Sequence, residues 1–205
     1  MIATEPSGQP IPSSAERIPV AISARHVHLT AEVIATLFGE QALHVHTGLV
    51  QPGQYAAEES VTLIGPRGRI PHVRIVGPAR AQNQVELSRT DAVHLGINAP
   101  VRESGDLAGT PGIVVEGPRG SVQLASGVIC ALRHVHMHPS EAERLSLKDQ
   151  DRIELAAESE GRRTLFRDVV VRVSPTYRLE MHLDTDEGNA AGLKSGDFMI
   201  LSRGA

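Results

Sequence analysis

Histidine stands out among the residue types of this 205-residue chain, which holds ten of them. Two pairs share one context, Arg-His-Val-His, at His26 and His28 and again at His134 and His136. In a β-strand, residues two apart point to the same face, so each pair would present two imidazoles side by side. Two nitrogens placed in this way can hold one metal ion when a third ligand comes from elsewhere. A single pair of this kind is more often solvent-facing, but the repeated context favours metal binding.

Two residues are candidates for the third ligands. Glu86 lies in the segment QVELS, where strand alternation sets its side chain opposite to Val85 and Leu87. A carboxylate that faces a β core is costly unless it is paired or bound to a cation. His182 lies in LEMHLDTDEGN, a β-type segment that runs into an acidic turn. Both residues are therefore candidate metal ligands.

The other histidines are interpreted as structural. His44 and His46 form a third pair, which lacks the preceding arginine and the following helix cap, so we expect it at the surface. His138 precedes a proline at an expected helix start, which is typical of a capping residue. The two isolated histidines, His72 and His94, carry no chemical signal of their own.

Arginine residues form a second cluster in the sequence. Four of them occur within fourteen residues: Arg67, Arg69, Arg74 and Arg80. Such a cluster is either a solvated strand face or a pocket for phosphate groups, which the planar guanidinium binds with two hydrogen bonds. The sequence GPRG, at 65–68 and 117–120, lacks the glycine pattern of a nucleotide-binding loop. Both interpretations of the cluster stay open at this point.

The elements that must position these residues are mostly short strands. Nine segments rich in β-formers and bounded by turn residues predict strands: 61–64, 72–76, 84–87, 113–116, 122–124, 152–155, 165–173, 179–183 and 198–201. Helical signals are few. Thr30 is a good N-cap for a helix that ends at Gly39, and Ser140 is the expected cap of a second helix. Many short strands with regular turns favour a sandwich or barrel over a doubly wound sheet.

An internal repeat sharpens this expectation. Residues 24–39, ARHVHLTAEVIATLFG, reappear as LRHVHMHPSEAERLSL at 132–147, and each copy predicts a strand end, a His-x-His pair and a capped helix. A weaker similarity links 94–106 to 191–197. We infer two similar β units that each contribute one histidine pair.

Composition excludes several classes of protein. Hydrophobic residues make up 40% of the chain, enough for a core, but no apolar run approaches the ~20 residues of a membrane span. The net charge of −4, the pI near 6.2 and the 2% of aromatic residues argue against nucleic-acid binding. Cys130 is the single cysteine, which fits a reducing compartment, and its apolar context favours a core position. Residues 1–17 are rich in Pro, Ser and Gly and predict a flexible tail.

Five segments occur in the order known from one family: 21–30, 51–70, 72–91, 127–142 and 179–193. They resemble the propanediol-utilisation type of phosphotransacylase, the phosphate propanoyltransferase family, and the resemblance spans about residues 18–203. It implies a mainly β fold of two small barrels capped by short helices. One barrel would combine 18–25 with 133–203, the other would span 26–132, and a two-zinc site would lie between them.

The resemblance also implies roles for individual residues. One zinc would be held by His26, His28 and Glu86, and the other by His134, His136 and His182. Arg80 matches the phosphate-binding arginine of the family. The positions that contact coenzyme A match Ile22, Ser23, Ala24, Arg67, Arg74 and Asn189. Gly188, beside Asn189, departs from the alanine that is usual in the family.

The implied reaction converts a short-chain acyl-CoA, propanoyl-CoA or acetyl-CoA, and inorganic phosphate into acyl phosphate and CoA. Direct attack of phosphate on the thioester is expected, because no residue resembles an activated acyl acceptor. The alternatives are a zinc-dependent hydrolase of a thioester or phosphoester and a non-catalytic metal-binding module. The family suggests a homodimer. A cytoplasmic location is expected, with a bacterial microcompartment as the alternative. The N-terminal segment shows no clear amphipathic helix of the kind that targets enclosed members of the family.

Overall fold

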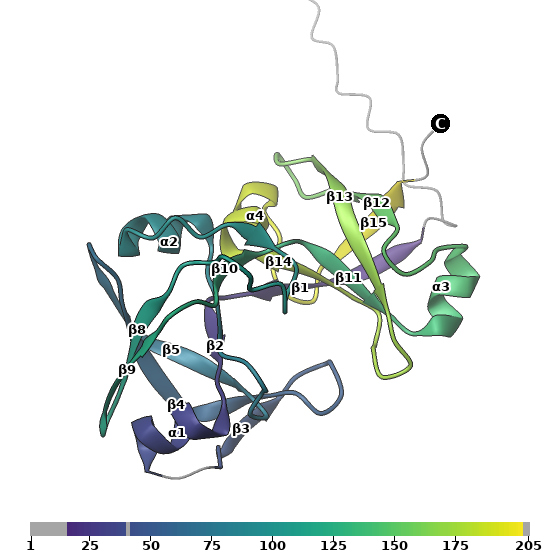
Figure 1. Cartoon of the computed structure of the whole chain (residues 1–205). Helices are drawn as coiled ribbons and strands as arrows, with labels where there is room; N and C mark the ends of the chain where they lie inside the picture. Colours follow the sequence, from purple (N-terminus) through teal and green to yellow (C-terminus); the bar gives the residue numbers. More distant parts are fainter. Residues whose placement is uncertain (1–15, 40–41, 203–205) are drawn as a thin grey trace, which may run out of the picture.

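The computed structural model describes residues 16–39 and 42–202, which form two β units side by side (Figure 1). One unit is a closed six-stranded barrel and the other is a curved nine-stranded sheet, a half-barrel. The predicted mainly β class is confirmed. The expected tail, residues 1–17, falls almost wholly outside the described residues, and Arg17 already belongs to the first strand.

The closed barrel is built from the first strand and the last third of the chain. Its order is β1 (Arg17–Ser23), β14 (Glu180–Asp184), β11 (His134–Met137), β13 (Thr164–Val173), β12 (Arg152–Ala157) and β15 (Phe198–Ser202). Helices α3 (Pro139–Leu145) and α4 (Thr185–Ala191) lie outside it. Alternating side chains such as Val135, Leu155 and Met181 are fully buried and form a core of its own.

The half-barrel sheet takes the middle of the chain. Its order is β7 (Val101–Arg102), β10 (Val128–Ala131), β6 (Gln84–Glu86), β2 (His26–His28), β5 (Arg69–Gly77), β4 (Tyr55–Ile64), β8 (Ile113–Gly117) and β9 (Gly120–Leu124), and β3 (Val45–Gly48) pairs with β4. Helices α1 (Ala31–Phe38) and α2 (Arg89–Leu95) complete it. A second buried core, with Leu63 and Ile75 at its centre, fills this unit.

The chain passes from one unit to the other next to each histidine pair. Strand β1 lies in the barrel and β2, which follows it, lies in the half-barrel. Strand β10 lies in the half-barrel and β11, which follows it, lies in the barrel. Both histidine strands therefore start in the space where the two units meet.

The internal repeat of the sequence is confirmed in the structure. Strand β2 lies between β5, which is parallel to it, and β6, which is antiparallel. Strand β11 lies in the same way between parallel β13 and antiparallel β14. A short helix follows the histidine strand in both units. The antiparallel partner carries the third candidate ligand in each case, Glu86 on β6 and His182 on β14.

Helix capping explains where the two expected helices begin. Thr30 caps α1 through its side chain, and Gly39 ends the helix at φ 81°, a left-handed conformation that glycine adopts without strain. The cap of α3 is His138 rather than the expected Ser140, because the ring of His138 accepts a hydrogen bond from the Ser140 backbone. Pro139 then occupies the first helical position, where its missing N–H costs nothing. Within the described residues, no helix is long and apolar enough to cross a membrane.

Candidate active site

The first candidate metal group joins β2 and β6. His26 lies opposite Glu86 in the antiparallel register, and His28 follows on the same face. The two Nε2 atoms of the histidines are 3.2 Å apart. Glu86 places Oε2 3.6 Å from Nε2 of His26 and Oε1 3.7 Å from Nε2 of His28. Three donor atoms of the kind that metal ions prefer therefore converge on one point.

Hydrogen bonds fix the tautomers of this pair. Nδ1 of His26 donates to the carbonyl oxygen of Ala24 at 2.9 Å, and Nδ1 of His28 donates to that of Val76 at 3.0 Å. Because a carbonyl only accepts, the proton of each neutral ring lies on Nδ1 and the lone pair lies on Nε2. Two lone pairs and a carboxylate then face one another, an arrangement that repels itself unless a cation lies between them. The residues fit a metal ion.

Electrostatics keep this group in its metal-binding form. Burial raises the pKa of Glu86, but the positive charge that His26, His28 and His134 carry when they are protonated outweighs it and holds that pKa well below its usual range. Burial also lowers the pKa of His28. Gln84 donates to Oε1 of Glu86 at 2.6 Å and fixes the carboxylate. The result is an ionised carboxylate beside a neutral imidazole.

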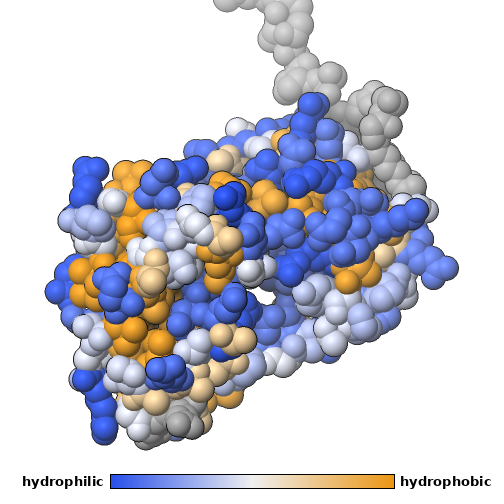
Figure 2. Space-filling view, viewed as in Figure 1, coloured by the Kyte–Doolittle hydropathy of each residue, from blue (hydrophilic) through white to orange (hydrophobic). Residues whose placement is uncertain are grey.

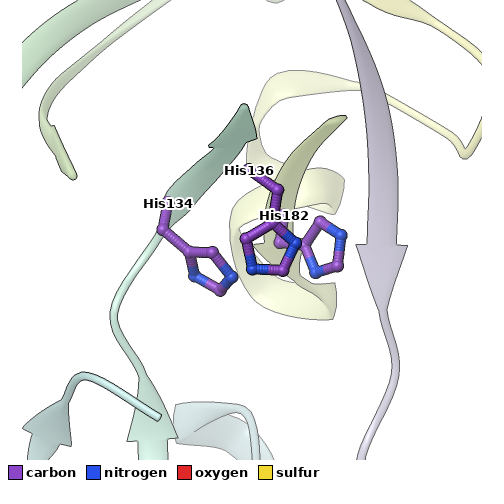
Figure 3. Close-up of side chains that lie close together, drawn as sticks. All are labelled: His134, His136 and His182. Carbon is purple, nitrogen blue, oxygen red and sulfur yellow. The ribbon is translucent and has the colours of Figure 1, made fainter. Parts of the chain in front are cut away.

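The second candidate group joins β11 and β14, with His134 opposite His182 in the register and His136 on the same face (Figure 3). The rings of His134 and His182 have centroids 5.1 Å apart, and those of His136 and His182 are 4.7 Å apart. Nδ1 of His134 donates to the carbonyl of Leu132 at 2.8 Å, which leaves Nε2 free to bind. Nδ1 of His136 is buried and has no hydrogen-bond partner. Such an orphaned nitrogen is costly without a ligand, so this group also fits a metal ion.

Burial also keeps two imidazoles of the second group neutral, those of His134 and His136. Burial and the neighbouring histidines lower the pKa of His134 to about 4 and that of His136 to about 2. Tyr177 stacks on the ring of His136, with centroids 4.3 Å apart and an interplanar angle of 22°. Neutral, oriented imidazoles are the form that binds zinc-like cations.

One cavity of about 440 Å³ joins both groups between the two units. Figure 2 shows an opening there, bordered by hydrophilic residues. The cavity is lined by all six candidate ligands and by Ile22, Ser23, Ala24, Arg25, Leu49, Gln54, Arg74, Val76, Arg80, Ser104, Gly105, Arg172 and Tyr177. Two candidate metal-binding groups and several arginine side chains thus share one cavity, which suits an anionic substrate.

Arg80 lies in the loop between β5 and β6, as the sequence predicts, and it leads into the strand of Glu86. The backbone N–H of Arg80 donates to the carbonyl of Leu29 at 2.9 Å. Burial lowers the pKa of its guanidinium, although Glu86 opposes the shift. An arginine remains charged even so. A half-buried guanidinium in this cavity can therefore donate strong hydrogen bonds to an anion.

The residues expected to contact coenzyme A separate into two sets. Ile22, Ser23, Ala24 and Arg74 line the cavity. Arg67 and Asn189 do not, and both are exposed outside it, in the turn after β4 and on α4. Gly188 packs against Ile22 so closely that an added Cβ would lie 2.6 Å from its Cδ1. A glycine at this position therefore leaves room for the side chain of Ile22, which lines the cavity.

The remaining histidines and the cysteine lie where the sequence places them. The side chain of His44 is 64% exposed and binds Glu59 at 2.7 Å, and the other four are also exposed: His46, His72, His94 and His138. Cys130 is buried, and burial raises the pKa of its thiol. None of these residues lines the cavity.

Five polar residues of this site were not predicted from the sequence: Gln54, Gln84, Ser104, Arg172 and Tyr177. Gln84 had a detectable signal, since it precedes Glu86 by two residues and shares its strand face. Arg172 lies opposite His136 in the parallel register of β11 and β13, a pairing that the sequence does not reveal. The loops that carry Ser104 and Tyr177 reach the cavity only through the tertiary fold.

The fold and the site define a class of protein. It has two β units, and the cavity between them suits metal ions and an anionic substrate. The phosphate propanoyltransferase family model matches residues 19–194. Curated relatives of that name include one from Thermotoga maritima, 53% identical over 183 residues (89% of this chain and 87% of the relative). Another, from Citrobacter rodentium, is 55% identical over 186 residues (90% and 89%), and one from Salmonella typhimurium is 51% identical over 175 residues (85% and 83%). The chain belongs to the phosphate propanoyltransferase family, a family of acyltransferases.

Proposed function

We propose that the chain transfers a short acyl group, propanoyl or acetyl, reversibly between coenzyme A and inorganic phosphate, with two zinc ions in the site. One observation carries the proposal: a single cavity contains both three-donor groups together with Arg74, Arg80 and Arg172. Metal ions held by such groups would polarise a carbonyl oxygen, and arginine side chains bind phosphate. The names of the relatives support the same reaction.

In this proposal each group holds one zinc ion. The first is bound by His26, His28 and Glu86, and the second is bound by His134, His136 and His182. Nitrogen and oxygen donors suit zinc, and three protein ligands leave an open position. When bound, such ions polarise a carbonyl or phosphoryl oxygen and stabilise developing negative charge.

Arg80 binds the phosphate in our proposal. Phosphate is a poor nucleophile in water because it is strongly solvated, and the guanidinium fork of Arg80 replaces part of that solvent. Two parallel hydrogen bonds fix the direction of the remaining oxygens, so that one of them faces the thioester carbonyl. Arg172 lies in the same cavity and adds positive charge opposite His136.

Coenzyme A then enters along the end of β1. Ile22, Ser23 and Ala24, with Arg74 beyond them, form the cavity wall at this point. In our proposal Arg67 and Asn189, which lie outside the cavity, bind the distal part of CoA. We also propose that the units are residues 18–25 with 133–203 and residues 26–132, each with its own buried core. A cytoplasmic homodimer completes the proposal.

Phosphate attacks the thioester directly. The phosphate oxygen forms the bond to the carbonyl carbon, the carbon–sulfur bond breaks, and the CoA thiolate leaves. Ser23 is a poor acyl acceptor, because Nδ1 of the nearby His26 carries its proton toward Ala24 and cannot serve as its base. Labelled acyl group captured on the protein in the absence of phosphate would contradict direct attack.

An assay of CoA release tests the proposed function. We expect thiol release from acetyl-, propanoyl- and butanoyl-CoA only when phosphate is present, with one acyl phosphate formed for each CoA. Release at the same rate without phosphate would instead identify a thioester hydrolase. Comparing the three chain lengths separates acetyl from propanoyl preference, because one methylene is worth about 1–3 kcal/mol in a fitted pocket.

A further inference from the structure

Glu180 is a buried carboxylate beside the second group that belongs to neither set of candidate ligands. It precedes His182 by two residues on β14, so both side chains lie on the same face of the barrel wall. In the β11–β14 register it lies opposite His136, as His182 lies opposite His134. Only 8% of Glu180 is exposed. A buried carboxylate needs partners, and those of Glu180 are informative.

The first partner of Glu180 is His182 itself. Oε2 of Glu180 accepts a hydrogen bond from Nε2 of His182 at 2.8 Å. The proton of this imidazole therefore lies on Nε2, and the lone pair lies on Nδ1. His26, His28 and His134 are held differently, because each donates its Nδ1 proton to a backbone carbonyl. His182 is thus oriented by a side chain, which mutation can remove.

The second partner comes from the other unit. Gln51 lies in the loop between β3 and β4 of the half-barrel, and only 3% of it is exposed. Its amide nitrogen donates to Oε2 of Glu180 at 3.2 Å and to the carbonyl of Arg178 at 3.1 Å. Its amide oxygen accepts from the Arg178 backbone N–H at 3.2 Å. Three hydrogen bonds from one glutamine therefore connect the half-barrel loop to the strand of the second group.

We propose that Glu180 is a positioning residue that directs Nδ1 of His182 toward the second metal ion, and that Gln51 holds Glu180 in place from the other unit. The inference rests on the proposed function, because it requires a metal ion at the second group. Carboxylate–histidine–metal chains are common in zinc proteins, and loss of the carboxylate typically lowers metal affinity about 10- to 100-fold. Metal affinity at the second group thus depends on a contact between the two units.

The test measures zinc affinity by competition with a chelator and the visible spectrum of the cobalt-loaded protein, on Glu180→Ala, Glu180→Gln and Gln51→Ala. We expect Glu180→Ala to lower affinity at one of the two sites about 10- to 100-fold and to leave the other unchanged. Glu180→Gln keeps an acceptor for the Nε2–H of His182, so it should retain more affinity. Gln51→Ala should fall between wild type and Glu180→Ala. The matched controls are Glu154→Ala and Gln123→Ala, which alter side chains far from the site and should bind as the wild type does.

Each other outcome has a defined meaning. Unchanged affinity at both sites in Glu180→Ala overturns the inference, and so does a loss in Gln51→Ala with none in Glu180→Ala. A cobalt spectrum altered in Glu180→Gln in the way that loss of a ligand alters it would make Glu180 a direct ligand. If Glu180→Ala does not fold, as judged by thermal unfolding of the chelated protein, Glu180→Gln and Gln51→Ala decide. Wild-type protein that binds no metal ion would instead overturn the proposed function.

Discussion

At the scale of single residues, four of the five imidazoles that line the cavity are fixed through one ring nitrogen so that the other is available. Backbone carbonyls orient three of the rings, and Glu180 orients His182. His136 differs, since its buried Nδ1 has no hydrogen-bond partner and its ring instead stacks on Tyr177. An imidazole whose lone pair already points in a fixed direction needs little free energy of reorganisation when a cation binds. This arrangement leads to three predictions.

Replacement of His134 by alanine should remove one metal ion and abolish transfer. The barrel should remain folded, because the ring lies at the edge of the cavity rather than in the core cluster. Metal analysis should fall from about two to about one equivalent per chain. The control is His46→Ala, an exposed histidine of the pair on β3, which should change neither metal content nor activity. A His134→Ala protein that still binds both ions tightly would show that the ligand assignment is wrong.

Arg80→Ala should lower turnover about 100-fold, since a charge-assisted bidentate contact is worth roughly 2–3 kcal/mol. Arg80→Lys keeps the charge but loses the fork, so it should weaken the use of phosphate and leave metal content and acyl-CoA binding near normal. Steady-state kinetics with phosphate varied at saturating acyl-CoA provide the measurement. Unchanged turnover and phosphate dependence in Arg80→Ala would move the phosphate site toward Arg67 and Arg74.

The chelated protein should lose stability as the pH falls from about 6.5 to about 4. Burial lowers the pKa of His134 to about 4, whereas the unfolded chain has the usual value near 6.5. In that window His134 is protonated in the unfolded state but not in the folded state. The free energy of unfolding therefore decreases as the pH falls. His134 alone would account for about 3 kcal/mol. Urea unfolding across this range measures it, and His134→Gln should show a shallower dependence; an equal slope in both proteins would contradict the assignment.

At the scale of the elements, the repeat extends beyond the histidine strands. The arginine before each pair binds an acidic residue in the first turn of the helix that follows the third-ligand strand: Arg25 binds Asp91 of α2 and Arg133 binds Glu187 of α4, both at 2.8 Å. These arginines lie where the chain crosses between the units. The Arg-His-Val-His motif therefore combines two candidate ligands with an ion pair that fixes the crossing.

Breaking either ion pair should destabilise the protein by about 1 kcal/mol. A double-mutant cycle of Arg133→Met with Glu187→Gln measures the interaction, and we expect a coupling near that value. Arg69 and Glu116 form an exposed pair at 2.6 Å, and the same cycle there should give a smaller coupling, because solvent screens it. Equal couplings at the two pairs would contradict a special role for Arg133.

Local patterns predicted much of this architecture. The His-x-His spacing, the strand alternation around Glu86 and the Thr30 cap were all readable, because each depends on neighbours within a few residues. Helices α2 and α4 were missed because weak helix formers make up much of both: Thr90, Asp91, Val93 and His94 in α2, and Gly188 and Asn189 in α4. The pairing of β1 with β14 joins segments about 160 residues apart in the sequence, which no local pattern reveals. The contact of Gln51 with Glu180 depends on the same kind of long-range arrangement. Glu180 itself had a local signal, since it precedes His182 by two residues on a β-type segment.

At the scale of the whole molecule, the cavity exists only because the two units meet. The half-barrel supplies the first metal group and Arg80, and the closed barrel supplies the second group and Arg172. The two chain crossings and the Gln51 loop hold these walls together. Transfer between a bound thioester and a bound phosphate needs both walls at once, because their relative placement decides whether the reacting atoms meet.

The most direct test of the central claim follows the oxygen atoms. Metal-loaded protein is mixed with propanoyl-CoA and unlabelled phosphate in ¹⁸O-water, and early products are analysed by mass spectrometry. Direct transfer to phosphate predicts one propanoyl phosphate for each CoA released, with no ¹⁸O in the acyl phosphate, because its bridging oxygen comes from phosphate. Propanoate that carries ¹⁸O, formed at a rate independent of phosphate, would show that water is the acceptor and would contradict the account.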